Sequence, residues 1–331
     1  MAHRRMVIPA LLLCLCLLMV PFGANAVSTS DAKAPISTEG KCTLTLSYIC
    51  RETAVADVPV KLFRVADVSA SAQYSLTDAF AASGVELNGI RSSAEWNTIR
   101  STLESYILAN EIDADFSART DQNGDSRFDE LKPGLYLLSA AQVVQNGWRY
   151  SFDSALISLP GLNEDGLWLY RLTVTPKSAA IPDEPDEEIQ YKILKLWKDE
   201  NGQEKRPESI DVEIFRNGKS YQTLSLSEAE NWSYTWTAED DGAVWKVAER
   251  NIPAGYSVTV EEKNATFILT NTLAEDPPQD TPTQDDPTPV KPAQKSPKTG
   301  DSSHILLYIV LMYVSGAMLI LLGITGKKKH V

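Results

Sequence analysis

The segment YKILKLW, residues 191–197, alternates in a way that predicts a β-strand. In a strand, every second side chain lies on the same face. One face of this segment consists of Tyr191, Ile193, Lys195 and Trp197. A charged ammonium inside an apolar layer costs several kcal/mol unless it is paired or becomes neutral. The position of Lys195 therefore requires either a buried partner or the loss of its charge.

The residues around this strand continue the same pattern. Short alternating segments are separated by the turn signals DENGQ, RNGK, AEDDG and IPAG. The expected strands cover residues 191–197, 211–216, 220–226, 232–237, 244–249, 256–260 and 266–272. About seven strands in a segment of this length indicate a β-sandwich domain over residues 189–272.

The preceding domain, residues 27–178, is also mostly β in pattern. Its expected strands are 43–49, 58–65, 134–139, 155–159 and 168–175. The exception is a helical insertion near 92–112, which opens with a capping box formed by Ser92 and Glu95. Trp96, Ile99, Leu103, Ile107 and Asn110 follow at helical spacing. We expect this helix to pack on one edge of the sandwich, and a partner-binding helix is the alternative.

Two Pro-rich, acidic stretches separate these parts. Residues 179–188 (AAIPDEPDEE) are expected to form a short linker. Residues 273–295 have no apolar periodicity and are expected to be extended and disordered. The predicted fold class is therefore all-β, with two tandem Ig-like or prealbumin-like β-sandwich domains and a C-terminal transmembrane helix.

The N-terminal residues have the pattern of an export signal. A basic start is followed by an apolar run over residues 8–20 and by an A-x-A arrangement that ends at Ala26. This predicts a secretory signal peptide over residues 1–26, with an uncleaved membrane anchor as the alternative.

The opposite end of the sequence has the pattern of a membrane anchor. Residues 305–324 carry no charge and are long enough to cross a bilayer as a helix. Lys327, Lys328 and Lys329 follow, which places the short tail 326–331 on the cytoplasmic side. The region between the two hydrophobic ends is therefore expected to act outside the cell.

Composition excludes several classes of function. All 44 acidic residues lie between the hydrophobic ends, whereas Arg4, Arg5 and Lys327–Lys329 lie outside, so the exported part is strongly acidic. This argues against nucleic acid as a partner. The only histidines are His3, His304 and His330, which excludes Ser-His-Asp hydrolases, Cys-His proteases and His-bearing zinc sites in the folded region. We expect neither a cofactor nor a metal.

Two further patterns have mainly structural interpretations. Cys42 and Cys50 are too far apart along one strand to form a disulfide, and they could pair only if the chain turned back between them. TDQNGDSRFDE, residues 120–130, is reminiscent of a calcium loop. Its glycine, however, is fourth from Asp121, whereas an EF-hand requires it sixth. A tight turn is the better interpretation.

SPKTGD, residues 296–301, directly precedes the hydrophobic segment and the basic tail. It resembles the LPXTG cell-wall sorting signal of Gram-positive bacteria, with serine in place of the usual leucine. The corresponding residues are Ser296, Pro297, Lys298, Thr299 and Gly300. The resemblance implies that a sortase cuts after Thr299 and joins its carbonyl to an amine of the wall or of a pilin.

The smaller domain resembles the collagen-adhesin B-type (Cna B-type) repeat. The similar stretches are KLWKDENGQEKRPESIDVEIFRNGK, LSEAENWSYTW, WKVAERNIPAGY and FILTNT. Many members of that family form an internal isopeptide bond between a first-strand lysine and a last-strand asparagine, promoted by an acid on a middle strand. The resemblance assigns these roles to Lys195, Asn271 and Glu249.

Strand parity points to the same three residues. Glu249 shares a face with Trp245 and Val247, and Asn271 shares a face with Phe267 and Leu269. Burial favours the neutral forms of an amine and of a carboxylic acid. A neutral Lys195 amine could then attack the Asn271 carboxamide while Glu249 promotes the reaction. An unreacted ion pair between Lys195 and Glu249 is the alternative.

The larger domain more loosely resembles the N-terminal domains of pilin-like surface proteins. Ser47 and Ser139 lie roughly where the lysine and the acid would be, so no isopeptide bond is expected there. WLYRLTVTPK, residues 168–177, is similar to a pilin motif that ends in the lysine joined by sortase to the next subunit. The candidate is Lys177, which parity places outward; an ordinary solvated lysine is the alternative.

Together these patterns predict a cell-wall-anchored structural protein, a sortase-processed pilin or fimbrial subunit, rather than an enzyme with turnover. Its expected partners are sortase and either peptidoglycan or other pilin subunits. The expected location is the extracellular surface, reached through a membrane-anchored precursor. The alternative is a monomeric adhesin that binds a host or matrix ligand. A hydrolase built on paired carboxylates is a third interpretation, but no two acids stand out for that role.

Overall fold

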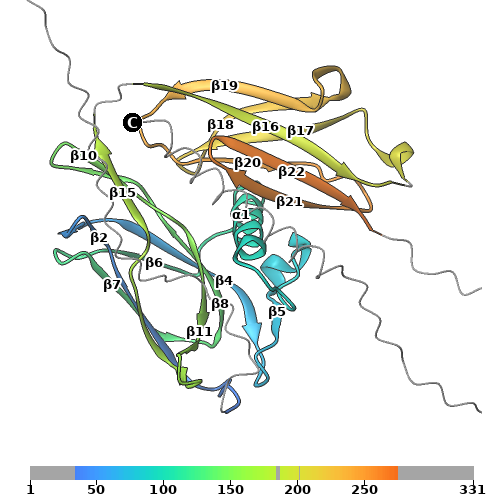
Figure 1. The fold of residues 1–331 in the computed structure, drawn as a ribbon. Helices are drawn as coiled ribbons and strands as arrows, with labels where there is room; N and C mark the ends of the chain where they lie inside the picture. The colour runs from blue at the N-terminus through green and yellow to red at the C-terminus, as the bar shows by residue number, and fades with distance from the viewer. Residues whose placement is uncertain (1–33, 184–186, 201, 275–331) are drawn as a thin grey trace, which may run out of the picture. The chain divides into compact units, whose positions relative to one another are not determined.

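The computed structural model describes residues 34–183, 187–200 and 202–274, which form two β-sandwiches (Figure 1). The predicted signal peptide, sorting motif, membrane segment and basic tail lie outside these residues, as does nearly all of the predicted wall linker. Within the described ranges, no helix is long and apolar enough to cross a bilayer.

The first sandwich is built from short strands around one long central strand, Pro59–Val68. Its strands are β1 (Cys42–Ser47), β2 (Ile49–Cys50), β3 (Thr53–Ala54), β4 (Pro59–Val68), β5 (Tyr74–Leu76), β6 (Phe116–Arg119), β7 (Asp125–Leu131), β8 (Gly134–Ala140), β9 (Val143–Gln145), β10 (Trp148–Phe152), β11 (Ala155–Leu159), β12 (Gly161–Leu162), β13 (Trp168–Leu169), β14 (Arg171–Val174) and β15 (Ser178–Pro182). The main sheets have the orders β14-β1-β7 and β11-β8-β4-β5, with β6 also paired to β4, and a third sheet has the order β15-β10-β9.

Helix α1 (Ser93–Ala109) confirms the predicted insertion and its capping box. The Ser92 hydroxyl accepts from the Glu95 backbone N–H, and the Glu95 carboxylate accepts from the Ser92 backbone N–H at 2.8 Å. Ile99, Leu103 and Ile107 are buried in a cluster with residues of β4 and β8. The helix thus covers a face of the β11-β8-β4-β5 sheet rather than only its edge, which explains why β8 is buried on both sides.

The predicted linker 179–188 is shorter than its composition suggested. Residues 178–182 form β15, which pairs antiparallel with β10, and the next strand already begins at Glu188. Ala180 is buried in the core of the first sandwich. The apolar residues of this stretch therefore find a sheet partner despite the prolines that follow them.

Of the turn predicted over 120–130, residues 120–124 connect β6 to β7, and residues 125–130 belong to β7 itself. The Asp121 carboxylate accepts from the backbone N–H groups of Asn123 and Asp125, which is typical of an aspartate-initiated turn. Gly124 has φ of 78°, and a Cβ there would lie 2.5 Å from the Tyr48 carbonyl oxygen. Glycine is therefore required by the turn. No cluster able to hold a metal occurs among the described residues.

The second sandwich contains all seven predicted strands. They are β16 (Glu188–Lys198), β17 (Ser209–Arg216), β18 (Lys219–Ser227), β19 (Ser233–Glu239), β20 (Trp245–Glu249), β21 (Tyr256–Lys263) and β22 (Thr266–Leu273). One sheet has the order β19-β16-β22-β21 and the other has the order β18-β17-β20. The first strand, β16, and the last strand, β22, are parallel neighbours, so the two ends of the domain meet in one sheet (Figure 1).

Candidate functional site

Three polar side chains meet in the core of the second sandwich. Lys195 Nζ donates to Glu249 Oε2 at 2.9 Å, and Asn271 Nδ2 donates to Glu249 Oε1 at 2.8 Å. The side chains of Lys195 and Glu249 have no exposed surface, and Asn271 is likewise fully buried. The carboxyl group of Glu249 thus bridges an amine and a carboxamide in a site closed to water.

The strands place these groups by parity and register. Lys195 follows the buried Ile193 on β16, and Asn271 follows the buried Leu269 on the adjacent β22. Glu249 is at the end of β20, in the opposite sheet, and follows the buried Val247. The site therefore joins the two sheets and lies where the first and last strands run side by side.

Burial changes the protonation of the amine. Desolvation lowers the pKa of Lys195 from 10.5 to about 8, although the negative charge of Glu249 and its hydrogen bond oppose this shift. A lysine with this pKa becomes largely neutral once the pH rises slightly above the physiological value. The neutral amine is the nucleophilic form. The site thus favours the reactive form of the lysine far more than water does.

An aromatic wall closes the site on the side of β16. Lys195 Nζ lies 4.5 Å from the ring centroid of Trp197, and Trp232 and Tyr256 each pack edge-on against Trp197 at 5.2 Å. Beyond it, the buried Asp199 accepts from the Tyr256 hydroxyl at 2.8 Å and pairs with Arg206. From the sequence alone, Trp197 is expected only as a core residue on the same strand face as Lys195. Its position two residues after Lys195 was the available signal of a role at the site.

The pilin-like motif of the first sandwich is ordered around an exposed lysine. Lys177 is exposed between β14 and β15, as parity predicted, and its backbone carbonyl accepts from Asp153 N at 2.9 Å. Pro176 is buried, and the Trp168 indole donates to the Ala34 carbonyl at 2.7 Å. The lysine therefore extends from a fixed backbone.

Ser47 and Ser139 stand in the first sandwich roughly where an isopeptide-forming lysine and acid would be expected. Ser47 is only partly buried, on the opposite face of β1 from the fully buried Leu44 and Leu46. Ser139 shares its face of β8 with Leu135 and Leu137, which pack in the cluster beneath α1. Neither serine faces the core between the sheets.

Cys42 and Cys50 lie in the same hydrophobic cluster but are not bonded. Cys42 and Cys50 are both free and buried, so the disulfide alternative is not formed. Burial raises the pKa of the Cys42 thiol to about 11, which keeps it protonated and unreactive.

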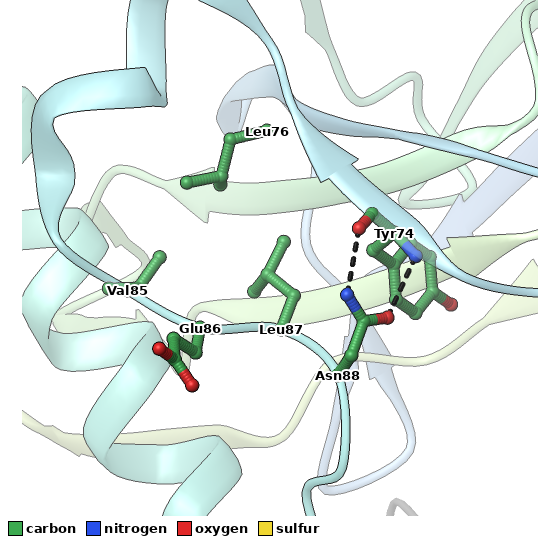
Figure 2. Close-up of a pocket in the computed structure, with 6 residues that line it drawn as sticks. All are labelled: Tyr74, Leu76, Val85, Glu86, Leu87 and Asn88. Carbon is green, nitrogen blue, oxygen red and sulfur yellow. Dashed lines mark hydrogen bonds between the residues drawn. The ribbon is translucent and has the colours of Figure 1, made fainter. Parts of the chain in front are cut away.

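A hollow of about 260 Å³ lies in the first sandwich beside β5, and Figure 2 shows its lining. The Asn88 side chain accepts from the Tyr74 backbone N–H and donates to the Tyr74 carbonyl, both at 2.9 Å, and so pairs the outer edge of β5 (Figure 2). Leu76, Val85 and Leu87 supply the apolar lining. The Asn88 amide thus occupies backbone hydrogen-bonding groups at a sheet edge.

Comparisons with known proteins agree with the fold of the second sandwich. Residues 191–272 match the family model of the Cna protein B-type domain. The collagen adhesin of Staphylococcus aureus is 33% identical over 120 residues, which cover 34% of this chain and 10% of the adhesin. The chain thus spans about a tenth of the length of this curated relative.

Solved structures with partial similarity include a single B repeat unit of the S. aureus collagen-binding surface protein. It is 17% identical with a TM-score of 0.25, and the match covers 71% of this chain and 99% of that one. The full-length major pilin SpaD of Corynebacterium diphtheriae is 14% identical with a TM-score of 0.30, and the match covers 72% and 65% of the two chains. The family match thus makes residues 191–272 similar to the Cna protein B-type domain.

Proposed function

From the similarity of the second sandwich to the Cna protein B-type domain, we propose that this chain is a wall-anchored structural protein of a Gram-positive surface. We further propose that it is a pilin or fimbrial subunit stabilised by an isopeptide bond between Lys195 and Asn271. The observation that carries the proposal is the buried contact chain from the Lys195 amine through the Glu249 carboxyl to the Asn271 carboxamide.

The bond would form by an exchange of amines at one carbonyl. The Lys195 ammonium first passes a proton to the Glu249 carboxylate, and the neutral amine then attacks Cγ of Asn271 while the C=O electron pair moves to Oδ1. Glu249, within 2.9 Å of the lysine nitrogen and 2.8 Å of the amide nitrogen, accepts a proton from the first and delivers one to the second. The bond from Cγ to Nδ2 breaks, ammonia leaves, and the carbonyl forms again. Each domain reacts once, and the buried charges disappear.

The location of the bond suggests its purpose. Lys195 and Asn271 belong to the first and last strands of the domain, so a bond between them closes almost the whole domain into one loop. A pulling force applied at the two ends of the domain would then pass through the covalent bond instead of separating β16 from β22. This suits a surface fibre exposed to shear and to proteases.

The mass of the protein tests the bond. The exported chain should weigh one ammonia less than its sequence mass, and digestion should give a cross-linked pair of peptides containing Lys195 and Asn271. Glu249→Ala should restore the full mass, because no other acid contacts either reacting group among the described residues. A well-folded parent chain with its full sequence mass would contradict the proposal and leave an unreacted buried ion pair.

Anchoring would depend on the motif at residues 296–300, which lies outside the described residues. We propose that sortase cuts after Thr299. Thr299→Ala should leave the protein in the membrane fraction, from which detergent releases it. Recovery of this variant only after peptidoglycan digestion would contradict the sorting role.

A monomeric adhesin is the second candidate, favoured by the 120-residue similarity to a collagen adhesin. The pilin subunit and the monomeric adhesin differ in the role that each gives to the exposed Lys177. A pilin subunit joined through this lysine should give a covalent ladder in wall extracts boiled in SDS, and Lys177→Ala should abolish it. A single band from the parent strain would favour the monomeric adhesin.

A further inference from the structure

Two buried polar groups beside the reactive site have no hydrogen-bond partner within the described part of the chain. One is a donor, the indole N–H of Trp197, and the other is an acceptor, the carboxamide oxygen Oδ1 of Asn271. An unpartnered polar group in a core costs about 1–3 kcal/mol. Because the amide nitrogen of Asn271 and both carboxylate oxygens of Glu249 are already in hydrogen bonds, Oδ1 is the group left over.

Strand register places the residues that carry the donor and the acceptor side by side. Trp197 of β16 and Asn271 of β22 are register partners in a parallel pair. Trp197 shares the face of Lys195, and the Trp197 ring lies 4.5 Å from the lysine nitrogen that must reach Asn271 Cγ. Neighbouring strands are only about 4.8 Å apart, so side chains of paired residues on one face are within contact range.

Taking the isopeptide bond of the proposed function as its basis, we propose that Trp197 is a further catalytic residue, whose indole N–H stabilises the oxyanion on Asn271. When the Lys195 nitrogen bonds to Cγ, the C=O electron pair becomes a negative charge on Oδ1. The indole donates a hydrogen bond to that charge, which is returned to the carbonyl as ammonia leaves. A donor that is unsatisfied in the starting state and paired in the transition state lowers the barrier, because its interaction appears only there.

The packing around Trp197 supports this role. Trp232 and Tyr256 each pack edge-on against the ring, with centroids 5.2 Å apart, so the Trp197 ring is held in place before the reaction begins. Trp236 and Trp245 also have buried, unpartnered indole N–H groups, but both lie in the aromatic cluster around Tyr191, on other strands. They provide matched controls within the same domain.

The test replaces the N–H of Trp197 while keeping its shape. The full-length chain is made by cell-free translation in detergent, either unchanged or with benzothienylalanine, the sulfur isostere of tryptophan, at position 197. Samples are quenched in acid and denaturant at intervals, and mass spectrometry follows the cross-linked peptide pair of Lys195 and Asn271. We expect the isostere to slow bond formation by roughly 10²-fold, the usual effect of losing one oxyanion donor, and Trp197→Phe to be slow as well.

Controls separate chemistry from folding. Trp236→Phe should form the bond at the parental rate, and near-UV circular dichroism in a Glu249→Ala background should show that the isostere folds like the natural residue. Parental speed in the isostere chain, or equal slowing by Trp236→Phe, would overturn the role of Trp197 and leave the proposed bond intact. A parent chain that forms no bond would overturn the proposed function itself.

Discussion

Each sandwich pairs its first strand with one of its late strands in the same way, but the two junctions contain different chemistry. In both, the two strands are parallel neighbours: β1 with β14, and β16 with β22. The inward pairs of the first junction are apolar, Leu44 with Leu172 and Leu46 with Val174. The second junction carries Lys195 and Asn271, with Glu249 facing them from the other sheet.

The two junctions are therefore stabilised by different interactions. The apolar junction is stabilised by burial alone, at about 25 cal/mol for each Å² removed from water. The polar junction pays for the desolvation of an amine and a carboxylate, and a buried ion pair recovers that cost poorly. A covalent bond would change the balance, because it removes both charges and restricts the unfolded chain. The following experiments test this contrast.

Glu249→Ala should have the largest effect. It prevents the bond, which closes a long loop and would raise the unfolding free energy by about 4 kcal/mol. It also leaves the Lys195 ammonium buried without its partner, which lowers the unfolding free energy by a further amount of about 3–5 kcal/mol. Urea denaturation should show a loss of stability in the second sandwich only. Glu239→Ala, which removes an exposed glutamate on β19, is the control and should change little. An equally stable Glu249→Ala chain would show that the junction contributes no covalent stability.

Leu46→Lys brings half of the polar junction into the first sandwich. Leu46 has no exposed surface, and neither Ser47 nor Ser139 faces the site to act as a partner. We expect a loss of about 3–5 kcal/mol in unfolding free energy, because the new ammonium is buried and unpaired. Leu46→Met keeps the volume and should cost less than about 1.5 kcal/mol. A mild effect of the lysine would mean that the apolar junction admits water more readily than its burial suggests.

The pH dependence of an unreacted chain should reveal the buried amine. In Asn271→Ala, Lys195 stays free, with its pKa lowered by desolvation from 10.5 to about 8. Between these pH values the unfolded chain binds a proton that the folded chain does not, so the unfolding free energy should rise with pH. The gain, at most a few kcal/mol, should be complete above pH 10.5 and absent below pH 8.

A double variant isolates that contribution. Lys195→Met with Asn271→Ala removes the titrating amine and keeps the tyrosines and cysteines that titrate in the same window. Subtracting its stability curve from that of Asn271→Ala should leave the rise due to Lys195. A flat difference across this window would mean that Glu249 holds the lysine charged in the folded state.

Sequence periodicity was sufficient for the second sandwich and for its site. Alternation placed seven strands, and parity placed Lys195, Glu249 and Asn271 on inward faces, where they meet. It was insufficient where a partner strand decides the structure, as in β15, whose acidic, Pro-rich surroundings suggested a linker. Short edge strands such as β9 and β12 have too few residues to show a period. The unpartnered groups of Trp197 and Asn271 depend on interstrand register, which alternation within one strand does not encode.

The smallest effect concerns the helix that the first sandwich uses and the second lacks within the described residues. Ser92→Ala removes the hydroxyl that accepts from the Glu95 N–H and so breaks one half of the capping box. Because α1 buries Ile99, Leu103 and Ile107 against β4 and β8, fraying of its first turn should lower the stability of the first sandwich by about 1 kcal/mol. Hydrogen exchange of the 93–109 segment should accelerate, while β16 and β22 remain protected. Ser93→Ala, at the next position, leaves the cap intact and should be nearly neutral. Equal exchange in both variants would show that tertiary packing, rather than the cap, holds the start of the helix.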